Sequence, residues 1–261
     1  MTRRILTFDC LEDELFGTLD SAEGESGLLI VSGGNEIRSG AWAGQAALAA
    51  RVAAAGYPVF RFDRRGVGDS EGANHGFRES RDDIAAAIVA FSKAAPHLRR
   101  VVAFGNCDAA SALMLFAAEL DLHGLLLANP WVIENDEDAP QARSALRRRY
   151  AAKLRDPAEW KRLASGGVDF RKLAGGLRQA AAPVKPSALA AQMRESLARF
   201  DRPARILLAE GDRTAQLFLE AWERADPRIE RIASASHSFA DEAARKWLFA
   251  QALEALQGPE P

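Results

Sequence analysis

The chain has few cysteines, few histidines and no excess of charge of either sign. Its 261 residues include 2 cysteines and 4 histidines, and the formal net charge is -2 at pH 7. These cysteines and histidines show none of the spacings of metal-ligand motifs, so we expect no metal and no other cofactor. A nearly neutral chain has no overall field that attracts polyanions, so we expect no nucleic acid as a partner.

Long apolar runs are also missing from the sequence. The longest, such as residues 125–128, are far shorter than the roughly 20 apolar residues that cross a bilayer. The first ten residues contain two arginines, and acidic residues follow them where the apolar part of a secretion signal would stand. We therefore expect no membrane insertion and predict a cytoplasmic protein. A reduced protein of this size needs no disulfide, so Cys10 is expected to pack as a small apolar residue.

The sequence does contain a regular alternation of apolar runs and amphipathic stretches. The apolar or extended runs predict strands at residues 3–8, 14–19, 27–32, 58–63, 100–105, 122–128, 204–209 and 228–232. The stretches between them predict helices at residues 42–55, 81–95, 109–120, 215–224 and 239–256. Strands alternating with helices indicate right-handed crossovers, and hence an α/β fold with a mainly parallel, doubly wound sheet.

Residues 131–201 interrupt this alternation. The stretch is helical in character and rich in arginine, and it contains two Gly-Gly pairs. An insertion of roughly 70 residues is too long for a plain connection between two strands, so it predicts a helical lid. The predicted domains are therefore a core formed by residues 1–130 and 202–261, with the lid inserted between two of its strands.

The segment Gly105-Asn106-Cys107-Asp108-Ala109 joins a predicted strand directly to a predicted helix. This is the pattern of a nucleophile elbow, in which a strained turn requires small residues two positions before and after the nucleophile. Gly105 meets that requirement and Ala109 nearly does. A helix N-terminus favours a thiolate, whereas the Asp108 carboxylate would oppose it at close range. We predict Cys107 as the nucleophile; the alternative is a cysteine that is simply buried.

A thiol nucleophile needs a base and an acid that orients the base. In folds with such an elbow the base comes last in the chain, and of the four histidines only His237 fits that order. Asp212 follows the preceding long strand and is predicted to hold the Nδ1–H group of His237. The alternative role for Asp212 is to cap the next helix, and Glu210 and Asp136 remain fallback candidates for the acid.

Two backbone N–H groups should form an oxyanion hole. One is expected from Asp108, directly after the nucleophile, and the other from Gly34 or Asn35, which follow the first long strand. The choice between Gly34 and Asn35 depends on a register that the sequence leaves open. The glycine-rich loop at residues 64–70 lacks the spacing of a phosphate-binding loop, so its glycines are expected to form a tight turn beside the site.

These residues together resemble the α/β-hydrolase superfamily over essentially the whole chain, and residues 63–70 are similar to its D-x-R-G-x-G-x-S loop. Four further segments resemble the hydrolases found with exosortase A systems in bacterial exopolysaccharide gene clusters: residues 32–35, 105–108, 127–132 and 160–169. That subfamily has no established substrate. It usually has glycine where this chain has Ala109, whose methyl group should tighten the elbow without abolishing it.

The predicted function is hydrolysis of an ester-like acyl bond (a thioester, a lactone or an activated ester) through a Cys-His-Asp triad and an acyl-cysteine. The partner would be a small-molecule acyl substrate, and the subfamily resemblance implies a link to exopolysaccharide production. Two alternatives stay open. One is an acyltransferase with the same triad, and the other is a hydrolase-like binding or scaffold protein without turnover, which Asp108 and Ala109 favour. The sequence leaves the oligomeric state open.

Overall fold

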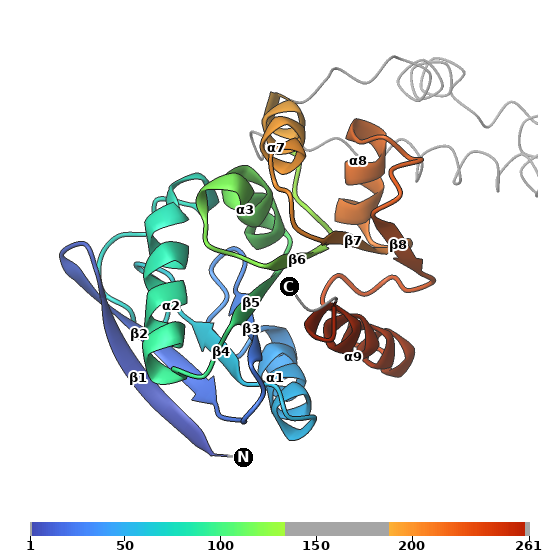
Figure 1. Cartoon of the computed structure of the whole chain (residues 1–261). Coiled ribbons are helices and arrows are strands. Elements are labelled where there is room, and N and C mark those ends of the chain that lie inside the picture. The colour runs from blue at the N-terminus through green and yellow to red at the C-terminus, as the bar shows by residue number, and fades with distance from the viewer. Residues whose placement is uncertain (1, 134–187, 259–261) are drawn as a thin grey trace, which may run out of the picture.

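The computed structural model describes residues 2–133 and 188–258, and among these residues eight strands form one sheet (Figure 1). The strand order is β1-β2-β4-β3-β5-β6-β7-β8. The first two strands form an antiparallel hairpin, β2 also pairs antiparallel with β4, and all other neighbours are parallel. The strands are β1 (Arg3–Cys10), β2 (Asp13–Asp20), β3 (Ser26–Val31), β4 (Val59–Phe62), β5 (Arg100–Asn106), β6 (Gly124–Ala128), β7 (Ala204–Ala209) and β8 (Ile229–Ile232).

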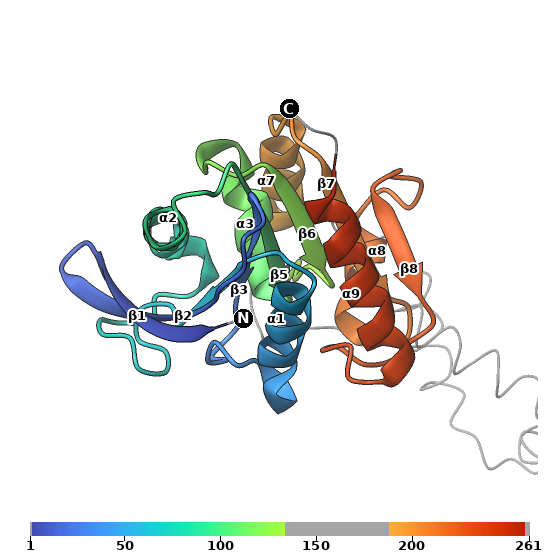
Figure 2. The same cartoon turned by 60° about the horizontal axis from the view of Figure 1, so that its bottom comes forward.

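Helices cover both faces of the sheet, which explains why β3 and β6 contain continuous apolar runs (Figure 2). One face carries α1 (Gly44–Ala54) and α9 (Glu242–Leu256). The other face carries α2 (Arg81–Ala94), α3 (Asp108–Phe116), α7 (Ala188–Ala198) and α8 (Arg213–Ala221). Three short 3-10 turns, η1 (Ala41–Ala43), η2 (Phe77–Glu79) and η3 (Ala117–Glu119), lie next to these helices.

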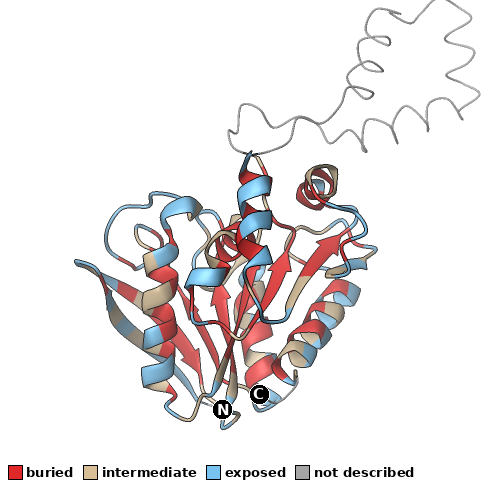
Figure 3. Cartoon of the chain, turned by 45° about the horizontal axis from the view of Figure 1, so that its top comes forward, coloured by how far each residue is buried: buried red, intermediate tan, exposed pale blue. Residues whose placement is uncertain are grey.

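The apolar core consists of two clusters, one on each face of the sheet. Successive side chains of a strand point to opposite faces, so Ala103 of β5 packs with the α2 and α3 side and Phe104 with the α1 and α9 side. Every residue of β4 and β6 is buried, and Figure 3 shows the buried strands at the centre of the molecule. The sheet is therefore a rigid base for the loops at the carboxyl ends of its parallel strands.

The predicted strands and helices outside the lid are confirmed, with ends that differ by a few residues. The fold is the predicted one, a mostly parallel sheet with helices on both faces. The largest differences are at helix ends: α3 ends at Phe116 rather than at residue 120, and α9 begins at Glu242 rather than Phe239. None of the helices among the described residues has the length and apolar character needed to span a membrane.

The end of the predicted lid packs with the core. Leu189 and Met193 of α7 are buried in the cluster that contains α3, and the Ser196 hydroxyl donates to Leu115 O over 2.6 Å. Residues 188–198 therefore belong to the layer of helices on this face. Residues 134–187 of the predicted insertion lie outside the described residues, so the lid stays a prediction.

Candidate active site

Cys107 occupies a sharp turn between β5 and α3. Its backbone has φ 62° and ψ -127°, a conformation that residues other than glycine rarely adopt and that typically costs about 1–3 kcal/mol. Two backbone hydrogen bonds stabilise this turn: Cys107 N donates to Ala128 O over 3.0 Å, and Ser111 N donates to Cys107 O over 3.3 Å. A Cβ atom on Gly105 would lie 2.7 Å from the backbone of Ala109, so the turn requires glycine there. This is the strand-turn-helix geometry that the sequence predicted.

His237 lies on the loop between β8 and α9, and its Nδ1 atom is 3.1 Å from Asp212 Oδ2. Hydrogen bonds with Asp212 and with Cys107 raise the pKa of His237 to about 10, against the opposing effect of partial burial. The same Asp212 oxygen accepts from Ala215 N over 3.0 Å, so the aspartate also caps α8. The two roles that the sequence offered for Asp212 are therefore compatible. Glu210 is exposed.

The other fallback acid, Asp136, lies outside the described residues. The three residues predicted as nucleophile, base and acid thus come together at the carboxyl ends of the strands, from loops that are far apart in the sequence. Carboxyl edges of open α/β sheets are where binding sites form, because the helix N-termini and the loops converge there.

Asn129 holds the backbone of the base, a role that the sequence did not predict. The residue is fully buried at the end of β6 with a left-handed backbone, φ 41°. Its Nδ2 group donates to His237 O over 3.0 Å, and its Oδ1 atom accepts from Ala209 N over 2.9 Å. The signal that could have found it is an amide side chain at the carboxyl end of a predicted parallel strand, directly before Pro130.

The loop after β3 meets the elbow through the Asp108 side chain. Gly34 N donates to Asp108 Oδ1 over 2.6 Å, and Arg64 Nη2 donates to Gly34 O over 2.6 Å. A Cβ atom on Gly33 would lie 2.8 Å from the same Asp108 oxygen, which explains the glycine at that position. The N–H group of Gly34, one of the two candidates for the second oxyanion donor, therefore already has a carboxylate acceptor. The side chain of Asn35 accepts from Asn74 Nδ2 over 2.8 Å.

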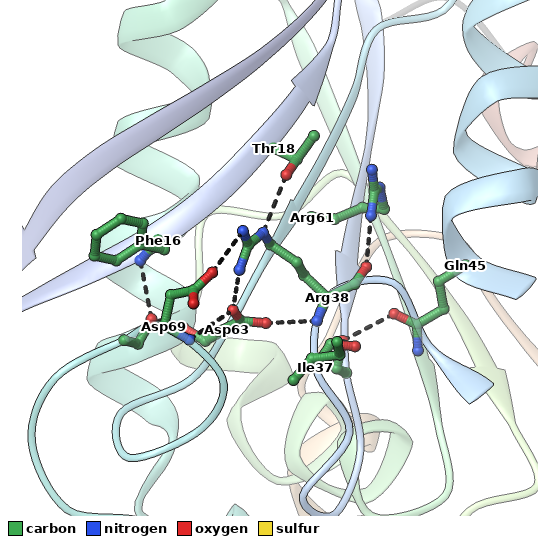
Figure 4. A network of polar contacts seen from close by, with 10 residues as sticks. Phe16, Thr18, Ile37, Arg38, Gln45, Arg61, Asp63 and Asp69 are labelled. Carbon is green, nitrogen blue, oxygen red and sulfur yellow. Dashed lines mark hydrogen bonds and ion pairs between the residues drawn. The ribbon is translucent and has the colours of Figure 1, made fainter. Parts of the chain in front are cut away.

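A buried polar network fixes the far end of this loop on β4 (Figure 4). The carboxylate of Asp63, fully buried, accepts from the backbone N–H of Arg38 and from its guanidinium group. Arg61 Nη1 donates to Arg38 O over 2.7 Å, and Arg38 Nε donates to Thr18 Oγ1 over 3.1 Å. The loop that carries the predicted oxyanion donors is thus held at both ends by side chains of β4 and the residues after it.

The second cysteine lies apart from this site. Cys10 is buried and its Sγ atom is 3.5 Å from Asp83 Oδ1. Burial, with the nearby Asp83 carboxylate, raises the pKa of the Cys10 thiol to about 12, which keeps it protonated and unreactive at neutral pH. In the part of the chain that the structure describes, no group of three or more His, Cys, Asp or Glu side chains could hold a metal ion.

The sequence matches the profile of the alpha/beta hydrolase family over residues 28–251. The chain belongs to this family. A search of curated proteins finds no match. Solved structures with the same fold include an esterase from Pyrococcus furiosus, which is 14% identical with a TM-score of 0.63, the match covering 98% of this alpha/beta hydrolase and 91% of that chain.

Two further structures extend the likeness over nearly the whole of each chain. The alpha/beta hydrolase GrgF from Penicillium sp. sh18 is 17% identical, with 98% of both chains covered and a TM-score of 0.62. A thioesterase domain from the curacin biosynthetic pathway is 14% identical, with 97% of this chain and 100% of that chain covered and a TM-score of 0.57. At such identities, the likeness shows that these alpha/beta hydrolases share a fold.

Proposed function

We propose that this alpha/beta hydrolase cleaves ester-like acyl bonds with Cys107 as the nucleophile, His237 as the general acid and base, and Asp212 as the group that orients His237. The observation that carries the proposal is the His237 imidazole, whose Nδ1 atom is 3.1 Å from Asp212 Oδ2 and whose pKa is raised to about 10 by its interactions with Asp212 and Cys107. This is the arrangement of an activated nucleophile, a base and a third group that fixes the tautomer of the base.

The charge state of the pair fits a thiol nucleophile. Because the pKa of His237 is raised to about 10, the imidazole carries a proton at neutral pH. In the proposed mechanism the reacting form of the nucleophile beside this imidazolium is the thiolate. The thiolate attacks the acyl carbon, and the tetrahedral intermediate collapses to an acyl-cysteine as His237 gives its proton to the leaving group. The neutral imidazole then takes a proton from water, which attacks the acyl-cysteine and regenerates the thiolate.

Backbone N–H groups would hold the oxyanion of each tetrahedral intermediate. The first is that of Asp108 at the start of α3. We assign the second to Asn35, because Gly34 N already donates to the Asp108 carboxylate; Gly34 would serve only after that carboxylate moves away. Losing one such donor typically raises the barrier by about 3 kcal/mol.

The proposed substrates are small-molecule thioesters, lactones or activated esters. Because a thiolate is a good leaving group, the tetrahedral intermediate formed from a poorly activated ester expels Cys107 and reverts to substrate. Substrates with a reactive acyl bond are therefore favoured. The esterase and thioesterase among the solved structures of the same fold support this chemistry. The exopolysaccharide link and the cytoplasmic location stay predictions from the sequence, as does an acyltransferase in which a hydroxyl group replaces water.

A second candidate function is a binding protein that keeps the fold without turnover. The contact between the Asp108 carboxylate and Gly34 N favours it, because a negative charge beside the nucleophile opposes both a thiolate and an oxyanion. The two candidates differ in whether Cys107 is acylated.

The test is acylation and turnover with nitrophenyl esters and acyl thioesters. We expect a burst of nitrophenol, an acyl group found by mass spectrometry on the peptide that contains Cys107, and loss of both in Cys107→Ala. His237→Ala should abolish turnover, whereas Cys10→Ala, which changes the other thiol, should leave kcat/KM unchanged. No burst, together with labelling of Cys107 by iodoacetamide at the rate of a free thiol, would refute the enzyme and favour the binding protein.

A further inference from the structure

Helices α1 and α9 lie on the sheet face opposite to α3 (Figure 2). A pocket of about 260 Å³ is lined by residues of these two helices, of the turn before α1 and of the carboxyl end of β5. Its larger apolar lining side chains are Trp42, Leu48, Phe104, Phe239 and Leu248. Two of its polar lining residues are neighbours of the proposed catalytic residues in the chain. Asn106 directly precedes the proposed nucleophile, and Ser238 directly follows the proposed base. The pocket thus adjoins both segments that carry the catalytic side chains, although no part of the proposed function accounts for it.

The cations around the pocket already have partners. Lys246 Nζ is 2.7 Å from Glu242 Oε1, and the Arg51 guanidinium lies 4.1 Å from the centroid of a phenylalanine ring on α9. The Arg245 guanidinium lies 5.5 Å from the ring of Trp42. The carboxylates of Glu36 and Glu242, which also line the pocket, offset most of this positive charge, so an anionic group would gain little there. The walls therefore favour an uncharged alkyl group.

Trp42 forms the mouth of the pocket in a strained conformation. Its backbone has φ 47° and ψ 27°, and Ala43 follows with φ 59°, so two successive residues other than glycine are left-handed. The indole Nε1 donates to Ser238 Oγ over 2.9 Å and thereby joins the turn before α1 to the loop of the base. A Cβ atom at position 44 would lie 2.6 Å from the indole, so a side chain there would displace the Trp42 ring. Strained residues of this kind concentrate at ligand clamps and active sites.

We propose that this pocket receives the acyl chain of the substrate, an uncharged alkyl chain of medium length; the proposal rests on the proposed function. The acyl carbon must lie between Cys107 and the backbone donors of the loop after β3, and that loop leads directly into the turn and helix that form one wall. The leaving group faces His237, which protonates it. A water molecule occupies about 30 Å³ in the liquid, and if each non-hydrogen atom of the ligand needs the same volume, a pocket of about 260 Å³ holds roughly nine such atoms. A hexanoyl or octanoyl group is of this size.

The first test measures kcat/KM for nitrophenyl esters from acetyl to dodecanoyl. Each buried methylene should raise kcat/KM about fourfold, so hexanoyl should exceed acetyl by on the order of a hundredfold before longer chains lose activity. Ala47→Phe adds a ring at an exposed lining position of α1 and should lower the octanoyl-to-acetyl ratio about tenfold. Ala54→Phe, also exposed and about two turns further along the same helix, lies outside the lining and should leave the ratio unchanged.

If Ala47→Phe and Ala54→Phe have the same octanoyl-to-acetyl ratio of kcat/KM, the assignment of the pocket is wrong, while the proposed hydrolysis is unaffected. A rate that depends on the length of the leaving alcohol instead of the acyl chain would overturn it as well. Trp42→Ala removes one wall, and it should shift the preferred acyl chain to greater length; an unchanged preference would count against the pocket.

The second test is independent of turnover. Heptyl methyl ketone has the alkyl chain and carbonyl of an octanoyl group but no leaving group, and its binding can be followed by calorimetry. We expect binding to the wild type and to Ala54→Phe, with at least tenfold weaker binding to Ala47→Phe. That result would support the pocket even if no ester is hydrolysed, in which case only the proposed function fails. Equal binding by all three proteins, or none by the wild type, would refute the pocket.

Discussion

Replacement of Asn129 tests whether the position of the base depends on a buried amide. The side chain is fully buried and connects two backbone segments, because it donates to His237 O and accepts from Ala209 N. Asn129→Ala removes both of these hydrogen bonds and a longer one, of 3.4 Å, from Asn129 Nδ2 to Asn106 Oδ1. It also leaves the buried N–H of Ala209 without its acceptor. It also places alanine at φ 41°, where asparagine is tolerated and alanine is strained.

The expected loss of stability follows from these contributions. Two hydrogen bonds contribute about 1 kcal/mol each, an orphaned buried donor makes the loss larger, and the left-handed backbone adds about 1 kcal/mol, so Asn129→Ala should cost about 3 kcal/mol. Asn129→Gly loses the same hydrogen bonds without the backbone strain and should cost about 1 kcal/mol less than the alanine variant. Asn129→Asp keeps the acceptor for Ala209 but places a negative oxygen against His237 O, so it should lower kcat more than it changes KM.

Urea denaturation followed by the fluorescence of the five tryptophans measures these costs. A loss below about 1 kcal/mol in Asn129→Ala would show that the amide does not hold the two segments together. Equal stabilities of the alanine and glycine variants would refute the backbone argument. If Asn129→Asp keeps the wild-type kcat, the position of His237 does not depend on this contact.

Three further predictions concern charged groups. The raised pKa of His237, about 10 against 6.5 in the unfolded chain, contributes stability below pH 6.5 that is lost as the pH rises through 10. Unfolding measured from pH 7 to 10 should therefore show a smaller loss in His237→Gln, and an equal loss would contradict the reasoning. Hydrogen bonds from Arg228 lower the pKa of Asp226 to about 2, so its contribution is present above pH 3.8 and lost as the pH falls through 2. Asp226→Asn should cost about 1–2 kcal/mol at pH 7 and show a flatter acid profile; a wild-type acid profile would count against this. Asp108→Ala removes the acceptor of Gly34 N and should cost about 1 kcal/mol in thermal unfolding, with a smaller effect for Asp108→Asn, and an unchanged midpoint in Asp108→Ala would refute the contact.

The sequence by itself determined the elements, their order and the elbow. Strands and helices follow from apolar runs and periodicity, which involve residues close together in the chain. The elbow is equally local, because the close approach of Gly105 to Ala109 arises within five consecutive residues. The order of nucleophile, acid and base along the chain then selected His237 and Asp212, which the structure places in contact.

Only the tertiary structure decided which contacts the side chains around the elbow make. The Asp108 side chain could have pointed toward the thiol or away from it, and its bond to Gly34 joins residues 74 positions apart. The bond from Asn129 to His237 spans 108 positions, and it exists because β6 and the loop after β8 converge at one edge of the sheet. The end of the predicted lid joined the core for the same reason, since α7 finds its apolar partner in α3. Contacts of this range depend on how the whole sheet and its helices pack, and a local sequence pattern carries no record of that packing.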